Sequence, residues 1–343
     1  MQQYIDYILE QAKVILSMDS PSGFTEKVTD YVVEEYRKLG YEVKKTNKGC
    51  VLAHIPGKDT KDGLMLTAHI DTLGGMVAEI KSDGRLRITP VGGLNANNVE
   101  GENCKIYTVD GEVYEGTCQL MDASIHVNGK YDEIKRNFDT VEIVLDEKVF
   151  SKEDTKKLGI ENGDFICFDP RTVITKKGYI KSRFLDDKLS AAILLGQAKY
   201  LKEHGMIPER DLYHYLTAFE EVGHGASASM PKNVTEIISV DMGCVGEGLE
   251  CREHQVSICS KDSMGPYHYE VVRKLILAAR ENKLDYAVDV YPHYGSDADV
   301  ALSAGVDCKH GLIGPGIYAS HGYERSHVDG VKNTFLLLIS YVK

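Results

Sequence analysis

Apolar residues recur at three- and four-residue spacing in two segments near the start of the chain. In the first segment they are Tyr4, Ile5, Ile8, Leu9, Ala12, Ile15 and Leu16. This spacing is typical of an amphipathic helix, and turn residues at positions 19–23 end it. Thr25 is then placed to cap a second helix, which closes at Gly40. We therefore predict helices over residues 4–16 and from Thr25 to Gly40.

Short apolar runs alternate with these helical patterns. We predict strands at residues 41–43, 50–55, 63–68, 212–218 and 236–240. Helical spacing returns around residues 189–196 and 267–279. Strands that alternate with helices in this way are typical of an α/β domain.

The middle of the chain has a different pattern. From about residue 77 to residue 175, short alternating runs are separated by glycine and Asp/Asn turns. Within this segment a helical period is clear at residues 152–158. The sequence therefore predicts one α/β domain, residues 1–76 and 176–343, interrupted by a β-rich domain over residues 77–175.

Acidic and imidazole side chains follow predicted strands or precede a predicted helix. The segments are His69-Ile70-Asp71, Asp186-Asp187, Glu220-Glu221 and Asp241. Ligands of open α/β sheets bind beyond the carboxyl ends of the strands, so we expect these side chains at one edge of the sheet. Carboxylates gathered there repel one another unless cations lie between them. Histidine and carboxylate ligands without cysteine suit zinc, cobalt or manganese.

Each of these motifs also has an ordinary structural interpretation. A single His-x-Asp is common, Asp-Asp before a helix often caps it, and Glu-Glu after a strand is usually a solvated turn. Glu220 and Glu221, however, stand directly between Phe219 and the Val-Gly pair 222–223, which disfavours a wholly solvated turn. We expect a second ligand histidine near the end of the chain, where His321 lies in a Gly-rich segment.

Composition narrows the class of partner. The 343 residues carry 40 Lys and Arg against 52 Asp and Glu, a formal net charge of −12. This balance disfavours nucleic acid and anionic membranes as partners, because both would repel the protein. The apolar runs are shorter than the roughly 18 residues of a membrane-spanning helix. The first residues lack a signal-peptide pattern, so we expect a cytoplasmic protein.

The motifs, taken in order, resemble the glutamyl aminopeptidase and tetrahedral aminopeptidase family of dinuclear metallo-aminopeptidases, some members of which carry an endoglucanase label. The resemblance rests on Pro21-Ser22-Gly23, Ala68-His69-Ile70-Asp71, Phe184-Leu185-Asp186-Asp187-Lys188, Phe219-Glu220-Glu221-Val222-Gly223, Ser239-Val240-Asp241 and Ser320-His321. It implies a zinc-exopeptidase-like α/β fold, with a mixed central sheet flanked by helices. It also implies that the insert is a small β-barrel that helps to build homodimers and, in many members, twelve-subunit shells.

The resemblance further implies a role for each residue. His69 and Asp241 resemble terminal ligands of one metal ion, and Glu221 and His321 resemble those of a second. Asp186 would bridge the two divalent ions, for which zinc is expected first and cobalt or manganese are alternatives.

Two further residues have implied roles. Glu220 resembles the general base, and Asp71 resembles the acid that orients His69. His327 competes with His321 as the last metal ligand, because the acid after His321, Glu324, follows it by three residues where the family usually has four.

These roles imply a dinuclear metal-dependent aminopeptidase, in which Glu220 activates a metal-bridging water against the peptide bond. Its partners would be peptides or small amides, and other copies of itself. An amidohydrolase or deacylase acting on a small N-acylated amino-acid derivative is an alternative, because related metallo-hydrolases use the same ligand order. A metal-binding scaffold with a dead site is a third hypothesis. Glu220 weakens the third, because a storage site needs no unliganded base. The sequence assigns no substrate-binding residue.

Overall fold

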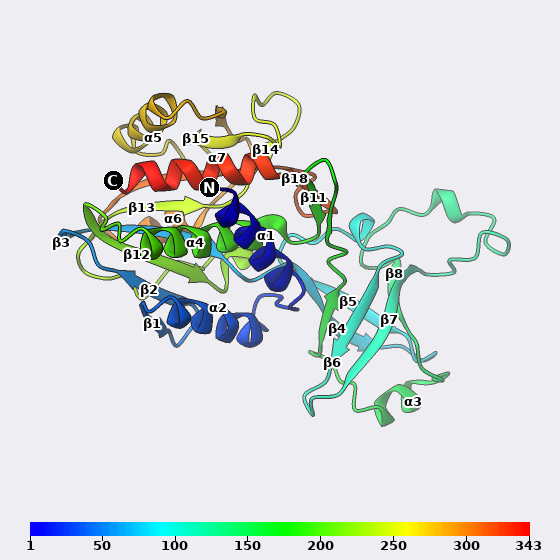
Figure 1. Ribbon diagram of the computed structural model, residues 1–343. Coiled ribbons are helices and arrows are strands. Elements are labelled where there is room, and N and C mark those ends of the chain that lie inside the picture. The colour runs from blue at the N-terminus through cyan, green and yellow to red at the C-terminus, as the bar shows by residue number, and fades with distance from the viewer. The chain divides into compact units, whose positions relative to one another are not determined.

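The computed structural model describes all residues, 1–343 (Figure 1). The chain divides into two compact units, Met1–Asp71 with Arg171–Lys343, and Thr72–Pro170. The divisions lie at 71/72 and 170/171, where the sequence suggested 76/77 and 175/176. Both lie earlier because the first strand of the second unit begins at Gly74, and a short strand of the first unit begins at Val173.

The first unit is built on a mixed sheet of twelve strands. They are β1 (Glu42–Lys45), β2 (Val51–Ile55), β3 (Asp59–His69), β10 (Val173–Ile174), β11 (Tyr179–Ser182), β12 (Arg210–Thr217), β13 (Val234–Val240), β14 (Gly243–Val245), β15 (Val256–Lys261), β16 (Tyr286–Val290), β17 (Lys309–Tyr318) and β18 (Glu324–His327). The main path runs β1-β2-β12-β3-β13-β17-β18-β11-β10. Strands β14 and β15 also pair with β17, and β16 pairs with β15.

Four neighbouring strands in the middle of this sheet, β12, β3, β13 and β17, run parallel. Three of them, β3, β12 and β13, correspond to the strands predicted at residues 63–68, 212–218 and 236–240. The last residue of β12, Thr217, lies opposite His69, the last residue of β3. The carboxyl ends of these strands therefore meet at one edge of the sheet.

Helices flank the sheet. They are α1 (Gln2–Leu16), α2 (Glu26–Lys38), α4 (Leu185–Glu203), the short η3 (Glu220–Val222), α5 (Tyr269–Glu281), α6 (Asp297–Ser303) and α7 (Val328–Tyr341). Helix α4 packs on β3, and α1 and α7 pack against α4 (Figure 1). Most residues of α4 are apolar and buried, as expected for a helix enclosed by other elements. No helix of the chain is long and apolar enough to cross a membrane.

The second unit is a closed barrel of six antiparallel strands, in the order β4-β5-β8-β7-β6-β9. Its elements are β4 (Gly74–Ile80), β5 (Leu86–Val91), η1 (Ala96–Asn98), β6 (Asn103–Tyr107), β7 (Val113–Leu120), η2 (Tyr131–Glu133), β8 (Val141–Leu145), α3 (Lys152–Lys157) and β9 (Phe165–Phe168). The barrel has its own buried apolar interior, which includes Ile88, Ile106, Ile143 and Ile166. The expected mixed sheet with an inserted small β-barrel is confirmed.

Candidate metal centre

The carboxyl edge of the parallel strands gathers the side chains that the sequence singled out. His69 ends β3, Asp241 directly follows β13, and the Glu220–Val222 turn follows β12. Asp186 lies at the start of α4, and His321 lies between β17 and β18. Elements that lie far apart in the sequence thus bring histidine and carboxylate groups together at this edge of the sheet.

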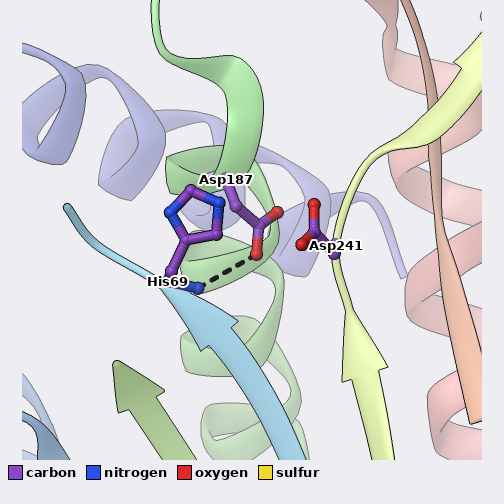
Figure 2. Close-up of side chains that lie close together, drawn as sticks. All are labelled: His69, Asp187 and Asp241. Atoms are coloured by element: carbon purple, nitrogen blue, oxygen red, sulfur yellow. Dashed lines mark hydrogen bonds between the residues drawn. The ribbon is translucent and has the colours of Figure 1, made fainter. Parts of the chain in front are cut away.

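Two overlapping groups of these side chains are close enough to share a cation. The ligand atoms of His69, Asp187 and Asp241 all lie within 4.8 Å of one another (Figure 2), and so do those of His69, Asp186 and Glu221. Figure 2 shows the imidazole and the two carboxylates facing a common centre. His69, Asp187 and Asp241 are buried. Buried histidine and carboxylate atoms at such separations are a donor set for a divalent metal ion.

His69 is held by both ring nitrogens. Its Nδ1 is 2.9 Å from the main-chain oxygen of Asp71, which can only accept, so Nδ1 carries the proton. Nε2 therefore faces the cluster, 3.0 Å from Asp186 Oδ1. A backbone carbonyl that fixes the tautomer of a ligand histidine is common at metal sites.

The carboxylate of Asp71 lies near His69, as expected, but its hydrogen bonds go elsewhere. Its Oδ1 is 3.6 Å from His69 Nδ1, farther than the Asp71 carbonyl oxygen. The carboxylate instead accepts the backbone N–H groups of Glu220, at 3.1 Å, and Glu221, at 3.3 Å. Ser22 Oγ donates to the same carboxylate at 2.5 Å. Asp71 therefore fixes the turn that carries the two glutamates.

The two candidate C-terminal histidines lie in different surroundings. His321 Nε2 is 3.7 Å from both Asp186 Oδ2 and Glu221 Oε2. His327 Nε2 instead contacts the Lys177 carbonyl oxygen at 2.8 Å, and its Nδ1 accepts from the backbone N–H of Asp329, capping α7. His327 is thus engaged in main-chain contacts, whereas His321 faces the cluster.

Two residues of the cluster were not among the expected site residues. Asp187 is fully buried, and its Oδ2 accepts from the backbone N–H of His69 at 3.1 Å. Its Oδ1 is buried without a partner. Glu324 accepts from the backbone N–H groups of Asp186, at 3.1 Å, and His321, at 3.0 Å. The Asp-Asp pair was a visible signal for Asp187, whereas Glu324 shows its role only through contacts made in the fold.

The cluster is electrostatically strained in the absence of cations. Burial raises the pKa of Glu220, Glu221 and Asp187 well above their ordinary values, and nearby carboxylates add to the shift. Burial and the charge of Asp186 raise the pKa of Asp241 to about 7. Although burial opposes it, the His69 hydrogen bond and charge lower the pKa of Asp186. The residues therefore fit a cation, which would replace the protons that these carboxyls otherwise retain and satisfy the orphaned Asp187 oxygen.

The cluster opens into a cavity of about 500 Å³. Its lining includes Asp186, Glu220, Glu221, Asp241 and His321, all from the first unit. The volume lies in the range that holds small ligands, and a few residues of an extended peptide fit such a space.

The mixed sheet therefore presents, at one edge, a donor set that could hold a metal ion. Residues 49–337 match the family described as M42 glutamyl aminopeptidase. The chain therefore belongs to the M42 glutamyl aminopeptidase family, which confirms the resemblance seen in its motifs.

Relatives of known sequence agree with this membership. YhfE of Bacillus subtilis, assigned as an aminopeptidase, is 43% identical over 335 residues, which cover 98% of this chain and 97% of YhfE. The glutamyl aminopeptidase of Lactococcus lactis is 26% identical over 261 residues, covering 71% of this chain and 72% of the relative.

Solved structures share the fold. The TET aminopeptidase of a marine-sediment Thaumarchaeota archaeon superposes with a TM-score of 0.88 at 19% identity, covering 98% of this chain and 96% of the other. The TET1 peptidase of Pyrococcus horikoshii gives a TM-score of 0.86 at 21% identity, covering 98% and 99%. At these identities the likeness establishes the architecture.

Proposed function

We propose that the protein is an aminopeptidase that uses two divalent metal ions and removes N-terminal residues from peptides. The observation that carries the proposal is the division of the Glu220-Glu221 pair. Glu221 Oε2 lies 3.7 Å from His321 Nε2 and belongs to a group of close ligand atoms with Asp186, whereas Glu220 Oε2 lies at the border of the cluster, 3.7 Å from His69 Nε2. A carboxylate that borders a metal centre without binding the metal is placed to act as a general base.

Five residues would hold the ions. His69 and Asp241 would bind one ion, Glu221 and His321 the other, and Asp186 both, which the short His69–Asp186 and His321–Asp186 separations support. Zinc suits this donor set best, and cobalt or manganese are alternatives. Such ions, when bound, polarise a carbonyl oxygen and make water acidic enough to supply hydroxide near neutral pH.

Asp187 is a further candidate ligand beside these five residues. Its carboxylate is as close to His69 and Asp241 as a shared ligand needs to be, and Oδ1 has no partner from the protein. Its Oδ2 holds the backbone N–H of His69, and its Oδ1 would be a further ligand oxygen for an ion held by His69 and Asp241.

The chain's own residues then perform the proton transfers. Glu220 accepts one proton from the attacking water at its carboxylate, while the new C–O bond forms at the scissile carbonyl. It returns that proton to the departing nitrogen as the C–N bond breaks, so the leaving group departs as a neutral amine. Asp71 holds the Glu220 backbone in place during both transfers.

The decisive experiment compares wild type with Glu220→Gln, both loaded with zinc. We expect kcat on aminoacyl amides to fall at least about 100-fold, because glutamine cannot accept the proton, while metal content stays at wild-type level. Asp329→Asn, an exposed acid at the start of α7, is the matched control and should retain activity. Full activity of Glu220→Gln would contradict the proposed role.

Substrates with free and acetylated N-termini separate the remaining alternatives. An aminopeptidase requires the free amine, whereas turnover of the acylated compounds alone would favour an amidohydrolase or deacylase. A zinc-loaded protein that hydrolyses neither would be a metal-binding scaffold.

We also propose that the protein self-associates through its barrel unit. The similar TET1 peptidase of Pyrococcus horikoshii assembles into a tetrahedron or an octahedral shell. The barrel of this chain carries strongly exposed apolar side chains, among them Val109, Ile125 and Val127, which supports a contact surface on this unit.

A further inference from the structure

The cavity extends beyond the metal centre to a second wall. Helix α6 supplies Asp299 and Val300 to this wall, and the segment after β15 supplies Met264. These residues lie outside both ligand groups. The wall would therefore contact a part of a bound substrate other than the bond that is cleaved.

Asp299 is the polar group of this wall with the most defined geometry. It is only 8% exposed, yet it lines the cavity. Its Oδ2 accepts hydrogen bonds from Ser296 N at 3.1 Å and Ser296 Oγ at 2.9 Å, and it lies 3.1 Å from the Tyr267 hydroxyl, which is closer to Asp262 Oδ2, at 2.6 Å. Oδ1 accepts no hydrogen bond from the protein, and the nearest cationic candidate, His310 Nε2, is 3.9 Å away. Ser296 thus holds one oxygen of the carboxylate in place, and the neighbouring Asp262 carboxyl is a second acid beside it, while no cation lies closer to Oδ1 than His310.

The ionisable side chains that line the cavity are mostly acidic. Its lining contains five acids, Asp186, Glu220, Glu221, Asp241 and Asp299, and no lysine or arginine. The first four border the metal centre, where bound cations would compensate them, but Asp299 has no such partner. Burial, and the neighbouring Asp262 carboxyl beneath Tyr267, raise the pKa of Asp299 to about 6. The carboxylate is therefore ionised above neutral pH.

We propose that Asp299 receives the cationic end of the first side chain of the substrate, so that the enzyme prefers lysyl and arginyl N-termini. The inference rests on the proposed aminopeptidase function and names its substrate class. Val300 and Met264 provide apolar surface for the methylene stem of such a side chain. A charge-assisted hydrogen bond to Oδ1 would complete the binding of the ammonium or guanidinium group.

The same geometry disfavours an acidic first residue. A glutamyl side chain would bring its carboxylate to Asp299 in a cavity without a lysine or arginine to receive it. Like charges at close range in a partly desolvated site are repelled strongly. Despite the family's glutamyl name, we therefore expect glutamyl substrates to be poor.

The test uses five amides assayed with zinc-loaded enzyme at pH 8: lysyl, arginyl, Nε-acetyllysyl, leucyl and glutamyl. Nε-acetyllysine retains the stem but lacks the charge. We expect kcat/KM for the lysyl amide to exceed that for the Nε-acetyllysyl amide at least about tenfold, because the buried carboxylate would otherwise lack a partner. The glutamyl amide should be the slowest of the five.

The variant Asp299→Asn should reduce the ratio of lysyl to Nε-acetyllysyl kcat/KM toward one. Asp307→Asn makes the same chemical change outside the cavity lining and should keep the wild-type ratio. If Asp299→Asn does not fold, the wild-type substrate series decides.

Equal wild-type rates on the lysyl and Nε-acetyllysyl amides, or an unchanged ratio in folded Asp299→Asn, would overturn the inference and leave the proposed function standing. If no free-amine substrate is hydrolysed, the proposed function itself fails, and the inference fails with it.

Discussion

Adjacent residues have different tasks at the metal centre. Glu220 and Glu221 follow one another in a single turn, yet Glu220 Oε2 lies 3.7 Å from His69 Nε2, and Glu221 Oε2 lies 3.7 Å from His321 Nε2. The turn can present both because the Asp71 carboxylate accepts the two backbone N–H groups. One buried acid thereby orients the proposed base and the proposed ligand together.

His214 predicts how stability depends on pH. It is fully buried in β12, 2.9 Å from both the Tyr36 hydroxyl and Gln197 Oε1, and burial lowers its pKa from 6.5 to about 3. The unfolded chain therefore takes up a proton at this residue below about pH 6.5, and the folded protein does not until about pH 3. The stability that this ring contributes is complete above pH 6.5 and is lost as the pH falls toward 3.

Urea unfolding at pH 4 to 7 tests this prediction. We expect His214→Gln to lower the pH slope of the free energy of unfolding by up to about 1.4 kcal/mol per pH unit, since one proton no longer distinguishes the two states. The exposed His204→Gln is the matched control. Parallel curves for wild type and His214→Gln would refute the prediction.

Other residues of the site show that a motif does not determine which contacts its side chains make. Asp186 and Asp187 are both buried acids at the start of α4, and adjacent carboxylates cannot be ranked before the backbone directions are known. Glu324 contacts Asp186 across 138 positions of the chain, so no local pattern indicates its role. The ligand types were predictable from the sequence, but the supporting contacts were not, because they join distant segments.

At the scale of elements, strand β17 shows why a glycine-rich segment can form a strand. It contains Gly311, Gly314, Pro315 and Gly316, a composition that disfavours a strand, and the sequence pattern predicts none there. The fold requires this composition. A Cβ atom on Gly314 would lie 1.4 Å from the backbone oxygen of Asp241, so glycine permits β17 to pass directly beside an expected metal ligand.

The substitution Gly314→Ala should therefore be severe. The obstructing atom belongs to the backbone and cannot rotate away, so we expect the free energy of unfolding to fall by about 3 kcal/mol or more. Zinc affinity should fall as well, because Asp241 has to move. Gly246→Ala, at a position with no atom within 4 Å of the added Cβ, is the control for the same change in open space. Denaturant unfolding and zinc titration measure both effects, and a stable Gly314→Ala with normal zinc affinity would contradict this account.

The helices illustrate the complementary case. Helices α1 and α2 expose one face, so their apolar residues recur with a clear helical period and the predicted ranges lie close to the observed ones. Helix α4 is buried on nearly all sides, and its apolar residues form an almost continuous run in which only residues 189–196 were predicted. Apolar residues recur with a helical period when one face of the helix is exposed to water, and this period weakens when the helix is buried on all sides.

At the scale of the whole molecule, the barrel unit bears on assembly. Ile125 is 61% exposed and Val127 is 78% exposed in the segment between β7 and β8. Large apolar side chains exposed together favour a contact with another chain. We expect sedimentation analysis to give a particle larger than the 38.1 kDa monomer.

The double variant Ile125→Asp with Val127→Asp should shift the population toward smaller species, because two charges would enter the contact. Val173→Asp, an exposed apolar position in the first unit, is the matched control. If the wild type is a monomer, or if the double variant assembles as the wild type does, the barrel surface at Ile125 and Val127 is not the contact between subunits.

The sequence by itself determined the class of the protein. Alternating strands and helices with a β-rich interruption indicated the architecture, and the ordered motifs at His69, Asp186, Glu220-Glu221, Asp241 and His321 indicated the family. Local patterns suffice for this because period and motif order are properties of neighbouring residues. Only the tertiary structure decided how those residues are supported. It placed His321 rather than His327 beside Asp186, brought the Asp71 carboxylate to the glutamate turn, and placed Asp299 in the lining of the cavity. These features depend on the register of parallel strands and on contacts between distant segments, and both form only when the chain folds.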